Sequence, residues 1–143
     1  MNSVPGFHDA LLTGISLAEK RVILAISRVN GELWHAIVHG VQALQVDEFR
    51  EGNIISHFEV VAGSEPSRDI LKRLFTPPHP AAEQQYHDAH AQLLDAKSRM
   101  VRDSEAVLVM VIPSYGAELA AFGVSFEAFP APIDTSTQAV SVA

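Results

Sequence analysis

Alternation of hydrophobic and polar residues constrains this chain more than any other feature. Residues 21–28 and 33–39 each direct every second side chain to one face, and Asn30 and Gly31 separate the two runs. A period of two is that of a β-strand with one buried face. An Asn-Gly pair between two such runs is a strong hairpin signal. The sequence therefore predicts an antiparallel hairpin in the first half of the chain.

Other segments have a similar strand character. Residues 11–17, 41–46 and 53–61 are predicted strands, and their short connections favour an antiparallel meander. Residues 106–112 form a nearly continuous apolar run, which is typical of a central strand buried on both faces and which Pro113 is expected to end. A last alternating run predicts a strand over residues 123–129.

The period changes to that of a helix in the middle of the chain. Ser67 is a good N-cap for a short helix over residues 68–75, which the prolines from Pro77 onward end. A longer helix is predicted over residues 81–102, and at roughly 30 Å it would reach across a whole small sheet. The apolar residues that recur at helical spacing in it are Tyr86, Ala89, Leu93, Ala96 and Met100.

These segments predict an α+β fold in which a curved, mainly antiparallel sheet of six to eight strands carries one long and one short helix. We expect residues 1–130 to form a single domain. Residues 131–143 form a C-terminal tail, which we expect to be either an edge strand, over residues 137–142, or an arm on a second copy of the chain. The residues expected in the core are Val22, Leu24, Ile26, Trp34, Leu44, Val46, Phe58, Leu93, Val109 and Val111.

Composition narrows the class of function. The chain has 143 residues, of which 48% are hydrophobic, and it contains no cysteine, which excludes disulfides and thiolate catalysis. A formal net charge of −7 argues against nucleic acid as a partner. No apolar stretch approaches the ~20 residues of a membrane span, and the N-terminus lacks the pattern of a secretory signal. We expect a cytoplasmic, bacterial protein.

The acidic residues concentrate in the predicted strand regions. Residues 68–102 hold six Lys or Arg and four Asp or Glu, whereas the rest of the chain holds four basic and thirteen acidic residues. This charge would steer a protein partner with a basic surface toward the strand regions. The interface residues expected from this distribution are Asp47, Glu48 and Glu51, in the loop before the strand at residues 53–61.

Seven histidines prompt a search for metal and acid–base sites. On the long helix, Glu83, His87 and His90 share one face, a spacing that suits either a metal or a solvated helix surface. Such a site needs further ligands from other helices, and the short helix offers no matching pair.

A second histidine group lies on the predicted strands. His35 and His39 share a strand face, and His57 and Glu59 share a face of a later strand. If these strands are neighbours in register, the four side chains form a metal or small-molecule site; otherwise they form the wet face of the sheet. The chain has no nucleophile elbow or phosphate-binding loop, so we predict no catalytic residue and no cofactor.

Three short patterns carry a resemblance to a known group of proteins. They are Phe7-His8-Asp9-Ala10, Glu51-Gly52-Asn53-Ile54-Ile55 and Pro113-Ser114-Tyr115-Gly116-Ala117-Glu118. They resemble small bacterial proteins of uncharacterised function, some of which are grouped with the immunity proteins of toxin systems. The resemblance implies a fold more than an activity. If the patterns meet at one end of the sheet, a polar pocket forms from His8, Asp9, Asn53, Tyr115 and Glu118; otherwise these residues serve separate turns.

Three functional hypotheses follow. The leading one is a non-catalytic protein-binding module of the immunity type, which would cover a basic surface of its partner. The second is a small-molecule or metal-dependent enzyme that uses the histidine-bearing face of the sheet. The third is a structural protein that associates with itself as a homodimer through the C-terminal tail.

Overall fold

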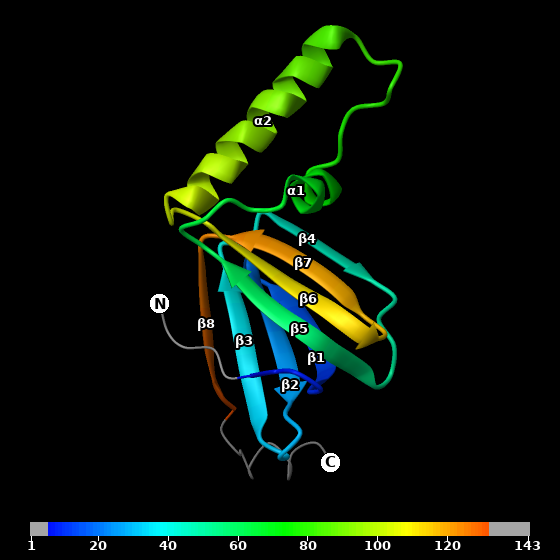
Figure 1. The fold of residues 1–143 in the computed structure, drawn as a ribbon, viewed down its shortest axis with the longest axis vertical. Helices are drawn as coiled ribbons and strands as arrows, with labels where there is room; N and C mark the ends of the chain where they lie inside the picture. The colour runs from blue at the N-terminus through cyan, green and yellow to red at the C-terminus, as the bar shows by residue number, and fades with distance from the viewer. Residues whose placement is uncertain (1–5, 132–143) are drawn as a thin grey trace.

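A computed structural model describes residues 6–131, which form an α+β fold with one antiparallel eight-stranded sheet and two helices (Figure 1). The strands are β1 (Leu11–Ala18), β2 (Arg21–Ser27), β3 (Leu33–His39), β4 (Ala43–Asp47), β5 (Asn53–Val61), β6 (Val107–Tyr115), β7 (Glu118–Gly123) and β8 (Ser125–Pro130). The helices are α1 (Arg68–Leu74) and α2 (Gln84–Arg102). The order across the sheet is β4-β7-β6-β5-β1-β2-β3-β8. The predicted fold class is confirmed.

The predicted hairpin joins β2 and β3. Arg28 and Glu32 close the turn with a backbone hydrogen bond of 2.8 Å, and Gly31 adopts a φ of +89°, which glycine accepts without strain. Strands β1, β2 and β3 form a meander, as the short connections predict. The meander ends there, because β4 lies at the opposite edge of the sheet from β3 and β8.

A long antiparallel ribbon, bent in its middle, curves the sheet. One side of the ribbon is β3 followed by β4, and the other side is β7 followed by β8. β3 pairs with β8 in one half of the ribbon, and β4 pairs with β7 in the other half. At the bend, the Val124 N–H donates to His39 O (2.8 Å) and the Gln42 N–H donates to Phe122 O (2.9 Å). We call these four strands the bent ribbon. Bends of this kind let one sheet form two walls of a core.

Glycine is required at the bend because the two halves of the ribbon approach closely there. A Cβ atom on Gly123 would lie 2.6 Å from Val38 Cγ1 and 2.7 Å from His39 O. On the other strand, Gly40 has a φ of +62°, and its Cβ atom would lie 2.6 Å from Val124 Cγ2. Neither position has room for a side chain.

The main core lies inside the curve of the sheet. The ring of Phe7, which precedes β1, packs edge-on against Phe58 and Trp34, with ring centroids 5.1 and 6.0 Å away. Of the predicted core residues, Leu44 and Val46 are partly buried against this core, as are Trp34 and Phe58. Those that are fully buried, as predicted, are Val22, Leu24, Ile26, Val109 and Val111.

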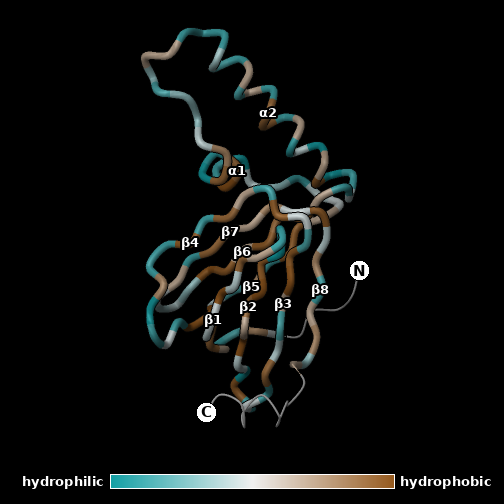
Figure 2. Tube along the Cα trace, turned by 180° about the vertical axis from the view of Figure 1, so that it is seen from behind, coloured by the Kyte–Doolittle hydropathy of each residue, from teal (hydrophilic) through white to brown (hydrophobic). Residues whose placement is uncertain are grey.

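The first five residues of β6, Val107–Val111, are buried on both faces, as the apolar run predicts, whereas Ile112 is 40% exposed. Val109 faces the main core, whereas Leu108 and Met110 form a second cluster with Leu74 of α1 on the outer face. Hydrophobic residues are accordingly concentrated along the strands, as the hydropathy of the trace shows (Figure 2). The short helix α1 therefore covers the part of the sheet that has no polar face.

The predicted end of the buried strand at Pro113 is wrong, and β7 was not predicted. β6 continues through Pro113 to Tyr115, because the β5–β6 ladder shifts register on both sides of Ile55, the partner of Pro113. A proline lacks the N–H of a regular ladder and is tolerated at such an irregularity. β7 is a short apolar run rich in alanine with no alternation, because it is buried on both faces.

The long helix does not lie across the sheet, which corrects the sequence-based prediction. Its C-terminal half packs at the end of the sheet, while its N-terminal half projects away from it (Figure 1). The buried residues are Leu94, Ser98 and Val101, whereas the predicted core residue Leu93 is 40% exposed. The helix thus presents a different face to the core from the one that its apolar spacing indicates.

Both helices begin and end near the predicted positions. The Ser67 hydroxyl accepts a hydrogen bond from the Ile70 N–H (3.3 Å), as expected of an N-cap. α2 begins at Gln84, three residues later than predicted, after an extended residue at Glu83. Among residues 6–131, neither helix is long and apolar enough to cross a membrane. The predicted strand or arm over residues 137–142 lies outside the described residues.

Replacing Gly123 by alanine is expected to lower the free energy of unfolding by about 1–3 kcal/mol, because the new methyl group must displace Val38 or the His39 carbonyl. Urea denaturation measures the change. Gly14→Ala, in β1, is the matched control, because its Cβ atom would meet only the Ala25 Cβ atom at an ordinary 3.7 Å. Equal stability of the two variants would contradict the close packing of the ribbon.

Candidate functional site

A buried asparagine organises the end of the sheet where β5 begins. Asn53 is 1% exposed, and its Nδ2 donates to Leu12 O (3.1 Å) and Arg50 O (2.5 Å). Its Oδ1 accepts from the backbone N–H groups of Arg50 (2.8 Å) and Ala117 (2.9 Å). One side chain therefore ties together β1, the loop before β5 and the turn between β6 and β7.

The turn between β6 and β7 is shaped to fit this asparagine. Gly116 has a φ of +84°, and a Cβ atom there would overlap Asn53 Oδ1. In the loop on the other side, Glu48 adopts a left-handed φ of +60° without being glycine or asparagine. Such a conformation persists where the surroundings hold it, and the hydrogen bonds of Asn53 to Arg50 lie two residues away.

The loop over residues 47–52, which we call the acidic loop, exposes both charged and aromatic groups. Asp47, Glu48 and Glu51 are exposed, as is Phe49, at 47%. Tyr115, at the end of β6, is 52% exposed. A shallow hollow of ≈ 440 Å³ borders the loop; its lining residues are Leu12, Thr13, Phe49, Arg50, Glu51 and Gly52.

The guanidinium of Arg50 neutralises one of the acidic groups. Arg50 Nη2 forms an ion pair with Glu48 Oε2 at 2.5 Å. The hydrogen bond and the charge of Glu48, followed by the nearby Tyr115 hydroxyl, raise the pKa of Arg50 above its ordinary value. Both side chains are exposed, so the pair adds little to stability. Its effect is to leave Asp47 and Glu51 as the net negative charges of the loop.

The sequence left open whether five residues gather at this end of the sheet or serve separate turns, and the backbones of three of them meet there. Tyr115 is the ladder partner of Ile54, the residue after Asn53. The Asp9 N–H donates to Ile55 O (2.8 Å). The side chain of Asn53, however, makes its four hydrogen bonds to main-chain groups in the interior.

The charged members of the predicted set have separate partners. His8 Nδ1 lies 3.1 Å from Asp9 Oδ2, and both side chains are more than half exposed. Glu118 accepts a hydrogen bond from Arg73 of α1 at 2.8 Å. The five side chains therefore do not converge on a single polar pocket.

The histidines of the sheet lie far apart. His35 and His39 are on β3, whereas His57 and Glu59 are on β5, and β1 and β2 lie between these strands. His39 Nε2 contacts Glu127 of β8 at 3.1 Å. Within residues 6–131, no three His, Asp or Glu side chains are placed to hold one metal ion. The predicted four-residue site is therefore not assembled.

The metal ligands predicted on α2, Glu83, His87 and His90, also do not form one site. His90 is half-buried and its Nε2 lies 2.7 Å from the Phe75 carbonyl oxygen, so this nitrogen donates a hydrogen bond that ties α2 to the end of α1. Glu83 precedes the helix and makes no side-chain cap. A separate, largely apolar hollow of ≈ 370 Å³ involves none of the predicted histidines; its lining includes Val60, Ala62, Val107 and Phe126.

Sequence reasoning placed Asn53 in the right region but missed its role and missed Phe49. The pattern Gly52-Asn53 at the start of a strand suggested a turn, whereas the asparagine is a buried clamp. An amide followed directly by an apolar strand is the one signal that could have pointed to it.

Comparisons with protein-family models, with curated proteins and with solved structures find no match.

Asn53→Asp is expected to lower the free energy of unfolding by about 2–4 kcal/mol, because a carboxylate cannot donate to Leu12 O or Arg50 O and would be charged inside the protein. Urea denaturation monitored by tryptophan fluorescence measures the loss. Asn30→Asp is the control, since Asn30 is exposed in the β2–β3 turn, and its effect should stay below ~1 kcal/mol. Equal losses would show that Asn53 is not a clamp.

Proposed function

We propose that this protein is a non-catalytic protein-binding module, of the immunity type suggested by its sequence patterns, which covers a basic surface of another protein with the acidic loop. The observation that carries the proposal is the rigid support of this loop by Asn53, which is buried and makes four hydrogen bonds to the backbone. A loop held in one conformation loses little entropy on binding, so its contacts contribute more to affinity.

The exposed groups on and beside the loop have the composition of a protein interface. Phe49 and Tyr115 offer large exposed rings, and aromatic residues are enriched among those that dominate binding energy. Asp47 and Glu51 supply negative charge beside them. Charge of this kind accelerates the encounter with an oppositely charged partner and selects against wrong ones.

The arrangement of the titratable groups supports binding rather than catalysis. Of the described imidazoles, His8 pairs with Asp9 and His39 pairs with Glu127, at separate places on the surface. An acid–base or metal site requires such groups to converge on one point. We further propose a cytoplasmic location in a bacterial cell, in keeping with a chain that contains no cysteine.

The test is affinity capture with the full chain immobilised, followed by binding measurements with the purified partner. Phe49→Ala is expected to weaken binding by roughly 10- to 100-fold, through loss of an aromatic anchor. Glu51→Lys is expected to slow association and to reduce the dependence of binding on salt. Glu105→Lys, an exposed charge reversal after α2, is the matched control and should leave binding unchanged.

Two results would contradict the proposal. One is a captured partner whose affinity is the same for the wild type and for both loop variants. The other is a partner whose binding surface is acidic, because the net negative loop would then repel it.

A further inference from the structure

The N-terminal half of α2 projects away from the sheet and contacts the rest of the protein through His90 and Ala91. In Figure 1 the helix rises from the end of the sheet, and the connection from α1 returns to its upper end. The buried residues of α2, Leu94, Ser98 and Val101, all lie in its C-terminal half. A projecting amphipathic helix of this kind is free to contact another molecule along most of its length.

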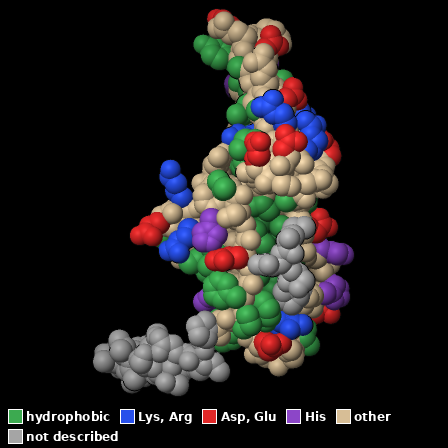
Figure 3. All heavy atoms as spheres, turned by 90° about the vertical axis from the view of Figure 1, so that its left-hand side faces the viewer, with side chains coloured by type: hydrophobic (Ala, Val, Ile, Leu, Met, Phe, Trp, Pro, Cys, Tyr) green, Lys and Arg blue, Asp and Glu red, His purple; other side chains and the backbone are tan. Residues whose placement is uncertain are grey.

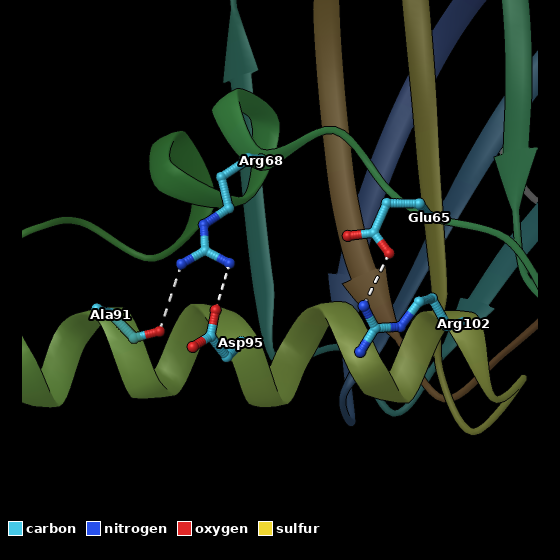
Figure 4. Close-up of polar contacts among 5 residues, drawn as sticks. All are labelled: Glu65, Arg68, Ala91, Asp95 and Arg102. Carbon is cyan, nitrogen blue, oxygen red and sulfur yellow. Dashed lines mark hydrogen bonds and ion pairs between the residues drawn. The ribbon is translucent and has the colours of Figure 1, made fainter.

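Polar contacts hold the helix in this direction. Arg68, at the start of α1, donates to Asp95 Oδ1 (2.6 Å) and to the Ala91 carbonyl (3.4 Å), and Arg102 pairs with Glu65 at 3.0 Å (Figure 4). These contacts lie on one side of α2, as Figure 4 shows for the two arginines. They add to the buried face and leave exposed the side of the helix that bears Tyr86 and Leu93.

The apolar residues on that other side form a regular series, which we call the α2 stripe. Its members are Tyr86, Ala89, Leu93, Ala96 and Met100, of which Ala96 is half-buried and Met100 packs partly against the core cluster that contains Leu94 and Val101. Their spacings alternate between three and four residues, which is the pattern of a coiled-coil seam. Tyr86 is 55% exposed and Leu93 is 40% exposed. Apolar side chains exposed in a row along a helix are typical of a surface that packs against another helix.

Large and small residues alternate along the stripe. Tyr86, Leu93 and Met100 occupy one seam position of the repeat, and Ala89 and Ala96 occupy the other. In an antiparallel pair of helices, each position of the first kind faces one of the second kind. A second copy in this orientation would therefore place an alanine opposite each exposed large side chain, which lets the helices approach closely without voids.

The charges along α2 favour the same orientation. Glu83 and Asp88 lie near its start, whereas the exposed Arg99 lies near its end. Lys97 is bound within the chain, where its Nζ donates to Gln42 Oε1 (2.6 Å). Where the helix joins the body of the protein, Lys and Arg side chains are interspersed with Asp and Glu side chains (Figure 3). Antiparallel alignment brings the acidic start of each helix beside the basic end of the other, and it also opposes the two helix dipoles favourably. A parallel pair would bring like charges together.

We propose that the α2 stripe docks on the α2 stripe of a second copy of this chain, with the two helices antiparallel. Tyr86 then contacts Ala96 of the partner subunit, and Leu93 contacts Ala89 of the partner subunit. In this arrangement the two sheets lie toward opposite ends of the helix pair. The inference goes beyond the proposed function, because the stripe shares no residue with the acidic loop.

The first test is the mass of the full chain by analytical ultracentrifugation over a range of concentrations. The wild type is expected to be a dimer, and Leu93→Asp is expected to raise the dissociation constant by at least ~100-fold, because it places charge in the seam of both helices. Ala91→Asp adds the same charge at an exposed position outside the stripe and should remain dimeric. Circular dichroism confirms that both variants keep the fold.

The second test uses the absence of cysteine from the chain to fix the orientation. Gln92→Cys, at the edge of the stripe near the two-fold axis, should join two copies through a short thiol-specific cross-linker. Ala96→Cys should not, because the two thiols would lie ~15 Å apart along an antiparallel pair. A wild-type monomer, a dimer insensitive to Leu93→Asp, or cross-linking through Ala96→Cys alone would each overturn the proposal, as would docking of a different protein on the stripe of a monomer.

Discussion

The sharp bend in the ribbon of β3–β4 and β7–β8 is the constraint on which the rest of the structure depends. Because Gly40 and Gly123 allow the two strand pairs to approach closely, one sheet supplies both walls of the main core. The outer face of β6 and β7 then turns toward α1 and α2, which cover it. The same curvature brings the starts of β1 and β5 to the turn after β6, where Asn53 joins them.

Local periodicity predicted most of the sheet, because half-buried strands carry their own signature. The alternation around Leu24 and the continuous apolar run around Val109 correspond to the burial that each strand has in the fold. The face of α2 that meets the core was not predictable in this way. Its stripe has the stronger apolar periodicity, yet Leu94 and Val101 are the buried residues, because contacts with α1 and the sheet orient the helix.

The candidate site was predictable only as a region. Short patterns indicated that Asp9, Asn53 and Tyr115 belong to one end of the sheet, and their backbones do meet there. The role of Asn53 depends on partners 41 and 64 residues away in the chain, and no local pattern encodes such distances. Whether a polar residue binds a ligand or satisfies the main chain is decided by tertiary pairing that a single sequence does not display.

The ladder between β3 and β8 also has a kinetic consequence. It joins Trp34 to Pro130, so the last described strand must be synthesised before the third can gain its outer neighbour. The hairpins of β1, β2 and β3 join close sequence neighbours and can form early. Pairing of β3 with β8 has a higher entropic cost, because it closes a very long loop of intervening chain. Until then the apolar face of β2 and β3 has no opposite wall. A chain emerging from the ribosome therefore passes through a stage with exposed apolar surface, at which binding of chaperones would reduce aggregation.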